Sequence, residues 1–300
     1  MKPWSQIGIY LFLALLLTLA GTAWSADRPP IIGLSHIGFQ VADLQKSKTF
    51  YRELLGFEEP FRLAKEASEP DRVYFKINNR QYVELCGGLK PDQEDTWVHL
   101  AYETADVEAM RRYLSEKGVA VPEKIAPDRI GNLSFLVRDF EGHSLEFVQY
   151  VPGSLFMKSA GKALPARRMS ERMFHAGMPV TDLAEAIRFY KDILGFSEML
   201  RSHTDRTPNW INYKVPEAGV YIEWTLLDKN TDRRKMSLRH HIGLSVFDVQ
   251  TAIETLRERA AALGQTAEGY PNVGFNNRWQ VGAFDPDGRR HELMEPYTMR

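Results

Sequence analysis

The chain contains one short pattern four times, and this repetition limits its possible folds more than any other feature. The segment HIGFQVADLQKSKTFYRELLGF, which begins at His36, matches HAGMPVTDLAEAIRFYKDILGF, which begins at His175, at ten of 22 positions. The two segments begin 139 residues apart, so the chain is a duplication. Each half repeats again more faintly, as HLAYETADV from His99 and HIGLSVFDV from His241. We therefore expect a tandem repeat of four units that share one structural plan.

Each unit begins as a strand followed by a helix. An aspartate lies seven residues after the histidine in all four copies, at the end of an alternating segment and before an amphipathic one, where an N-cap belongs. The four residues are Asp43, Asp106, Asp182 and Asp248. Gly56 and Gly195 then follow the apolar residues of their helices, as C-terminal caps do. Short runs such as VYFKINNRQYVEL come next, so each unit is predicted to be βαβββ, within an α+β fold.

The alternation of the first strand predicts where its histidine points. In HIGFQV, the apolar residues Ile37, Phe39 and Val41 share one face and can pack beneath the helix. His36 lies on the other face, toward the open side of the sheet. The same holds for the histidine of every unit.

A glutamate follows each of these histidines at a nearly constant spacing of 47 to 51 residues, in the last strand of the unit. The four residues are Glu84, Glu146, Glu223 and Glu292. A single histidine at a strand start is more often packed or solvated than bound to a metal. Here, however, four of the eight histidines in the chain occupy one repeat position, each with its glutamate. This regularity favours metal binding.

The N-terminus is typical of a secretory signal peptide at residues 1–26. A lysine near the start precedes an apolar run from Ile7 to Ala20, and Ala23-Trp24-Ser25 fits a cleavage site. The alternative is an uncleaved membrane anchor, because the apolar segment could just span a bilayer. We expect cleavage, export to the periplasm or the exterior, and no stable membrane insertion afterwards. Cys86 is the only cysteine, so no internal disulfide supports the fold.

Length and charge limit the domains and the partners. Three hundred residues suffice for about two domains. We place them at 27–151 and 172–300, joined by a basic linker at 152–171 that we expect to be solvated. The formal net charge is −1, which offers no basic surface for nucleic acid. The expected partner is a small-molecule substrate, and the oligomeric state stays open.

These motifs together resemble the vicinal oxygen chelate superfamily, which includes glyoxalase I, extradiol dioxygenases and bleomycin-resistance proteins. The resemblance rests on His-x-Gly, the Asp-Leu cap, Phe-Tyr-x-x-x-Leu-Gly-Phe and the closing Asp-Pro-Asp-Gly, and covers roughly residues 32–151 and 172–298. It implies two cup-shaped domains, each made of two βαβββ units around one divalent metal. The first cup would use His36, Glu84, His99 and Glu146, and the second His175, Glu223, His241 and Glu292. This donor set suits Zn, Ni, Fe, Mn or Co and does not select among them.

The resemblance leaves three functions to compare. Glyoxalase-like isomerase or lyase chemistry, through a metal-stabilised enolate, ranks first because both ligand sets are complete; Glu146 and Glu292 would then transfer the proton. Export would separate the protein from the main glutathione pool, so we expect another substrate. An extradiol dioxygenase with Fe(II) on His175, His241 and Glu292 ranks second, because Gly282 stands where that group has a tyrosine. A non-catalytic small-molecule binder ranks third, because bleomycin-resistance members lack the ligands.

Overall fold

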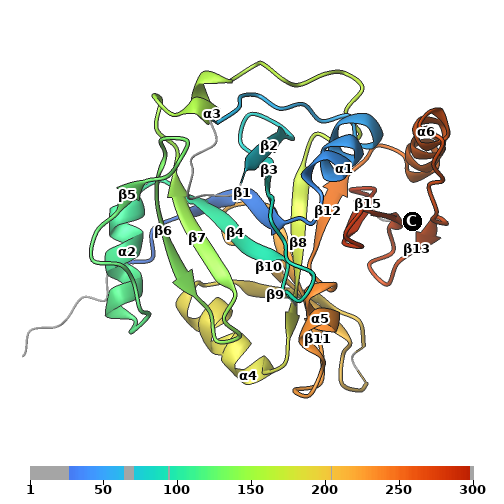
Figure 1. Cartoon of the computed structure of the whole chain (residues 1–300). Helices are drawn as coiled ribbons and strands as arrows, with labels where there is room; N and C mark the ends of the chain where they lie inside the picture. Colours follow the sequence, from blue (N-terminus) through green and yellow to red (C-terminus); the bar gives the residue numbers. More distant parts are fainter. Residues whose placement is uncertain (1–26, 64–70, 94, 204, 298–300) are drawn as a thin grey trace, which may run out of the picture.

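The computed structural model describes residues 27–63, 71–93, 95–203 and 205–297, and its strands form two separate curved sheets (Figure 1). The predicted signal peptide at residues 1–26 lies outside the described residues. Within the described part, none of the helices combines the length and the apolar character needed to cross a membrane. The two sheets confirm the predicted α+β fold of two cup-shaped domains.

The N-terminal sheet is built from the first two units and has seven strands in the order β2-β3-β1-β4-β7-β6-β5. The strands are β1 (Ile31–Gln40), β2 (Arg72–Lys76), β3 (Tyr82–Cys86), β4 (Trp97–Thr104), β5 (Ala126–Pro127), β6 (Leu133–Arg138) and β7 (Ser144–Gln149). The first strands of the two units, β1 and β4, pair antiparallel at the centre, and each is flanked by the parallel last strand of its own unit. The two units therefore lie on either side of the β1–β4 pair, and the short β5 is an additional edge strand of the second unit.

The C-terminal sheet repeats this order with eight strands, β13-β14-β15-β12-β8-β11-β10-β9. The strands are β8 (Met173–Val180), β9 (Ser197–Arg201), β10 (Trp210–Lys214), β11 (Tyr221–Leu226), β12 (His241–Ser245), β13 (Asn272–Val273), β14 (Trp279–Phe284) and β15 (Arg290–Met294). Its additional strand, β9, corresponds in the first unit only to two isolated bridges, Glu58 with Lys76 and Arg62 with Val73. The βαβββ plan is thus complete in the second, third and fourth units, whereas the first unit has only bridges in place of one strand.

Helices follow the first strands as the caps predict. They are α1 (Leu44–Thr49), α2 (Val107–Glu116), α4 (Leu183–Ala186) and α6 (Val249–Ala262). Two further helices lie elsewhere: α3 (Leu155–Lys158) follows β7 and α5 (Arg233–Ser237) follows β11. All four predicted aspartates cap a helix by accepting backbone N–H bonds. Gly56 and Gly195 have φ of +74° and +75°, which confirms them as left-handed C-caps. The sequence did not predict that α1 and α4 continue as wider π-helical turns, Phe50–Leu54 and Ile187–Ile193.

The two halves share one apolar core, and a tyrosine from each π-helical turn crosses to the other half. The hydroxyl oxygen of Tyr51 lies 2.7 Å from Nε2 of His291, and the Tyr190 hydroxyl donates to Oδ2 of Asp139 at 2.7 Å. In Figure 1, the helix labelled α1 correspondingly lies beside the C-terminal strand β15, which carries His291. The helices of the first and third units therefore hold the halves together.

The sequence predicted a solvated connection between the halves, but the structure shows that part of this connection is buried. Phe156 of α3 is buried, with its ring centroid 4.7 Å from that of Tyr82. The ammonium of Lys76 donates to the backbone carbonyl of Ser159 at 2.5 Å. A basic, Gly/Pro/Ser-containing segment resembles a solvated linker, but a single inserted aromatic side chain is enough to fasten it to the N-terminal sheet.

Candidate metal centres

Strand register explains why each cup collects two histidines and two glutamates. In the N-terminal sheet, Gly38 pairs with Glu84 on one side and with His99 on the other. Ala101 pairs likewise with Glu146 and His36. Residues in one cross-strand row project to the same face, so each row places a glutamate and a histidine on either side of a small residue.

The C-terminal sheet contains the same two rows. Gly177 lies between Glu223 and His241, and Gly243 lies between Glu292 and His175. The glycines are sterically required, because a Cβ added at Gly177 would lie 1.8 Å from Cε1 of His241, and one at Gly243 would lie 1.9 Å from Cε1 of His175. The His-x-Gly motif therefore has a physical reason, since each glycine makes room for the histidine of the neighbouring unit.

All four predicted ligands of the N-terminal cup converge. Nε2 of His36 lies 3.1 Å from Oε2 of Glu146 and 4.0 Å from Oε2 of Glu84. Nε2 of His99 lies 3.3 Å and 3.5 Å from the same two oxygens. Ligands that each lie about 2.1 Å from one ion are roughly 3.0–3.5 Å apart. His36, His99 and Glu146 are spaced like such a set, and Glu84 lies beside them at 3.5 Å from His99 and 4.0 Å from His36.

A hydrogen-bond chain behind His36 leaves its Nε2 free to bind a cation. The Tyr150 hydroxyl donates to the carbonyl of Arg80, so the hydroxyl of Ser35 donates to Tyr150, at 2.6 Å. Nδ1 of His36, 2.9 Å from the Ser35 oxygen, is then the donor of the remaining bond. Its Nε2 points at the carboxylate oxygens of Glu146 and Glu84, where either a metal ion or a proton on Nε2 would satisfy them.

The electrostatics of the N-terminal cup favour an ionised Glu146 and a neutral His99. Burial raises the pKa of Glu146, but the adjacent imidazoles of His36 and His99 outweigh this effect and lower it to about 2. Burial lowers the pKa of His99, which favours the neutral imidazole that a metal needs. Arg72 donates to the outer oxygen of Glu84, Oε1, at 2.6 Å, so Oε2 faces the histidines.

The N-terminal cup opens into a cavity of about 340 Å³ that a small substrate could enter. Its wall contains all four predicted ligands together with Tyr74 and Tyr82. The ring of Tyr82 stacks on His36 with 4.3 Å between centroids, and Phe156 packs against Tyr82 from behind. The linker between the halves thus supports the ligand His36 through an aromatic stack.

The C-terminal cup gathers its ligands less tightly. Nε2 of His175 lies 3.1 Å from Oε2 of Glu292, and Nε2 of His241 lies 3.5 Å from Oε1 of Glu223. His175, His241 and Glu292 form a triad that could bind a metal, as His36, His99 and Glu146 do in the other cup. Glu223 stands outside this compact triad, as Glu84 does in the other cup, although the register brings it to the same face.

Arg290 reaches into the C-terminal cup, and the sequence analysis did not consider it. Its guanidinium donates to Nε2 of His241 at 3.3 Å and lies 3.6 Å from Oε1 of Glu292. Burial raises the pKa of Glu223 to about 8, with the charge of Glu292 adding to the shift and Arg290 opposing it. Burial also raises the pKa of Glu292, but its contact with His175 and the charge of Arg290 outweigh this and lower it to about 2. Strand alternation could have revealed Arg290, because it lies two residues before Glu292 and shares its face.

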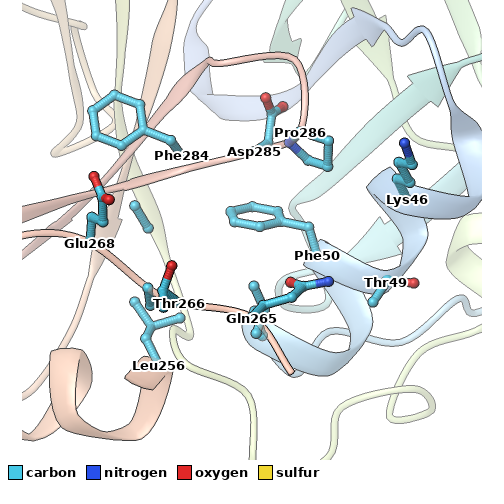
Figure 2. Close-up of a pocket in the computed structure, with 13 residues that line it drawn as sticks. Lys46, Thr49, Phe50, Leu256, Gln265, Thr266, Glu268, Phe284, Asp285 and Pro286 are labelled. Atoms are coloured by element: carbon cyan, nitrogen blue, oxygen red, sulfur yellow. The ribbon is translucent and has the colours of Figure 1, made fainter. Parts of the chain in front are cut away.

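A larger cavity, of about 590 Å³, lies between the halves and away from both cups. Figure 2 shows Phe50 pointing into it from α1 and its π-helical turn, opposite the segment that carries Thr266 and Glu268. No histidine lines this cavity, and its Asp285 is paired with Arg289. Its lining does not provide the donor set that the cups share.

Comparisons with known proteins agree with this geometry. The profile of the Glyoxalase/Bleomycin resistance protein/Dioxygenase superfamily matches residues 33–147 and 172–293. A lactoylglutathione lyase of Arabidopsis thaliana is 24% identical over 276 residues, which span 87% of this chain and 90% of that protein. A lactoylglutathione lyase of Haemophilus influenzae is 29% identical over 130 residues, 41% of this chain and 92% of that protein.

Solved structures of extradiol enzymes share the fold. Homoprotocatechuate 2,3-dioxygenase from Brevibacterium fuscum superimposes with a TM-score of 0.67 at 19% identity, over 91% of this chain and 74% of that one. The 2,3-dioxygenase LapB from Pseudomonas superimposes with a TM-score of 0.67 at 16% identity, over 89% of this chain and 95% of that one. At these identities the likeness concerns the fold alone.

Proposed function

Because the chain belongs to the Glyoxalase/Bleomycin resistance protein/Dioxygenase superfamily, we propose that it is a metal-dependent enzyme with glyoxalase-like isomerase or lyase chemistry. The observation that carries the proposal is the convergence of His36, Glu84, His99 and Glu146 at the wall of a cavity of about 340 Å³. The lactoylglutathione lyases among its relatives support the same reaction class. The working site in this proposal is the N-terminal cup.

The residues of this cup have distinct roles in the proposed reaction. His36 and His99 hold a divalent ion through Nε2, and such an ion supplies Lewis-acid polarisation of substrate oxygens. Arg72 restrains Glu84 through its outer oxygen, so Glu84 stays a ligand. Glu146 contacts the imidazoles of His36 and His99, and it is the residue we assign to proton transfer. Glu292 holds the corresponding position in the C-terminal cup.

The substrate class follows from the cup and from the proposed export of the chain. Two imidazoles and two carboxylates leave an octahedral ion two positions, which neighbouring substrate oxygens can fill. Residues 1–26 have the composition of a signal peptide, and an exported enzyme works away from the cytoplasmic glutathione pool. We therefore propose a small hydroxy-carbonyl compound rather than a glutathione adduct.

Metal content and turnover test this proposal together. The chain Asp27 to Arg300, purified without chelator and reloaded with Ni, Zn, Fe, Mn or Co, is assayed on hydroxy-carbonyl substrates beside His36→Ala and His241→Ala. We expect His36→Ala to lose one equivalent of metal and to lower kcat/KM by at least about 1,000-fold, as loss of a reaction's Lewis acid should. Metal content and turnover that are unchanged in His36→Ala would contradict the proposal.

An extradiol dioxygenase is the second candidate, because His175, His241 and Glu292 form a triad of two histidines and a carboxylate. The wall of the adjacent cavity, however, contains no tyrosine or histidine to move a proton. Oxygen uptake with catechols and Fe(II), abolished in His241→Ala and retained in His36→Ala, would favour this candidate over the first.

A further inference from the structure

The two cups have the same candidate ligands and the same strand register but differ in where their arginines bind. Arg290 faces the C-terminal cup two residues before the ligand Glu292, and Ser144 holds the corresponding position two residues before Glu146. Serine is too short to reach across the cup. The N-terminal cup has its own arginine, Arg72, but this side chain binds the outer oxygen of Glu84, away from the histidines.

Arg290 contacts the groups that an ion would bind. Its guanidinium donates to Nε2 of His241 at 3.3 Å, and Nδ1 of that histidine is 2.9 Å from the carbonyl of Arg239. Nδ1 can only donate to a carbonyl, so Nε2 is the acceptor and its lone pair is used by Arg290. The same guanidinium lies 3.6 Å from Glu292 and 4.0 Å from Glu223.

We propose that Arg290 is a built-in cation of the C-terminal cup, which takes the place of a divalent ion and leaves the N-terminal cup as the high-affinity metal site. The guanidinium neutralises the paired carboxylates and occupies the imidazole lone pair, both of which the ion needs. A fixed positive charge about 4 Å from a site weakens the binding of a dication by roughly 100-fold or more. The proposal rests on the proposed function only in taking the N-terminal cup as the metal centre.

Removal of the guanidinium should therefore create a second metal site. Co²⁺ binding to the chain Asp27 to Arg300 is measured by calorimetry and by the visible absorption of the bound ion, for the wild type and for Arg290→Ser, which introduces the residue of the other cup. We expect one tight equivalent in the wild type and two in Arg290→Ser, with the second bound at least about 100-fold more tightly than any second ion in the wild type. Arg290→Lys keeps the positive charge and should bind one equivalent of Co²⁺.

Two further variants test whether the additional ion binds in the C-terminal cup. Arg290→Ser combined with His241→Ala should return to one equivalent, because the new site loses a ligand. Ser144→Arg, the converse change, should weaken binding at the N-terminal cup. Two equally tight equivalents in the wild type, or one in Arg290→Ser, would overturn the inference. No ion in the wild type with one in Arg290→Ser would support the inference while contradicting the proposed function.

Discussion

The two cups show how one backbone arrangement supports two different sites. Each cup has two cross-strand rows of glutamate, small residue and histidine. In the N-terminal cup, Ser35 fixes the ring of His36 by a hydrogen bond to Nδ1. Phe174 holds the equivalent position in the C-terminal cup, and Nδ1 of His175 has no hydrogen-bond partner among the described residues. Neighbours of the ligands, rather than the ligands, distinguish the two sites.

The small residues in the rows offer the strongest test of this comparison. Ala101 tolerates its methyl group beside His36, whereas a Cβ at the equivalent Gly243 would lie 1.9 Å from Cε1 of His175. His175 stacks on Tyr221 with 4.8 Å between centroids, so its ring cannot move without losing that contact. We expect Gly243→Ala to lower the free energy of unfolding by about 2–3 kcal/mol, as overpacking does. Denaturant unfolding of the variant and the wild type measures this change in the free energy of unfolding.

The matched control for this prediction is Ala101→Gly in the N-terminal cup. It removes a methyl group without forcing any ring to move, and should cost about 1 kcal/mol from greater chain freedom. If Gly243→Ala were no more destabilising than Ala101→Gly, the steric difference between the rows would be refuted.

The two tyrosines that join the halves give the next largest effect. Tyr190 donates to the buried carboxylate of Asp139, whereas Tyr51 bonds the imidazole of His291. Hydrogen bonds to charged groups contribute about 1.5–3 kcal/mol and neutral ones about 0.5–1.5 kcal/mol. We expect Tyr190→Phe to cost about 2 kcal/mol and Tyr51→Phe about 1 kcal/mol, measured by chemical denaturation. The reverse order would show that the carboxylate is satisfied without the tyrosine.

The same two junctions are also expected to differ in pH dependence. Burial lowers the pKa of His291 to about 4, so the unfolded chain binds its proton near pH 6.5 and the folded chain only near pH 4. His291 therefore stabilises the fold fully above pH 6.5, and this contribution is lost as the pH falls toward 4, with a slope of up to about 1.4 kcal/mol per pH unit. The Tyr190 junction differs, because the partner of Tyr190 is the carboxylate of Asp139 rather than an imidazole.

His291→Gln keeps a polar partner for Tyr51 and removes the titrating ring. Between pH 6.5 and 4, the free energy of unfolding of this variant should fall less steeply than that of the wild type. The difference in slope is up to about 1.4 kcal/mol per pH unit, which corresponds to one bound proton. Other buried histidines contribute to the remaining slope, so the difference between the two proteins is the relevant measurement. Identical slopes would assign the acid sensitivity to those other residues.

Sequence reasoning succeeded where a local rule repeats. The four aspartate caps, the glycine C-caps and the strand alternation each depend on a few neighbouring residues, and their recurrence in four copies removed the ambiguity of each one alone. The faces of His36 and Glu84 follow from the same alternation. The π-helical turns and the burial of Phe156 could not be predicted, because they depend on contacts with distant parts of the chain.

The amino-acid sequence is sufficient to predict a fourfold repeat in which each unit carries one histidine and one glutamate on the open face of its sheet. The tertiary structure alone decided how those side chains meet, because cross-strand register sets which small residue separates each pair. It also decided that Arg290 enters one cup and that Tyr51 reaches His291, 240 positions later in the chain. Periodicity records which way a side chain points, whereas the distance between charges is set only when the strands are assembled.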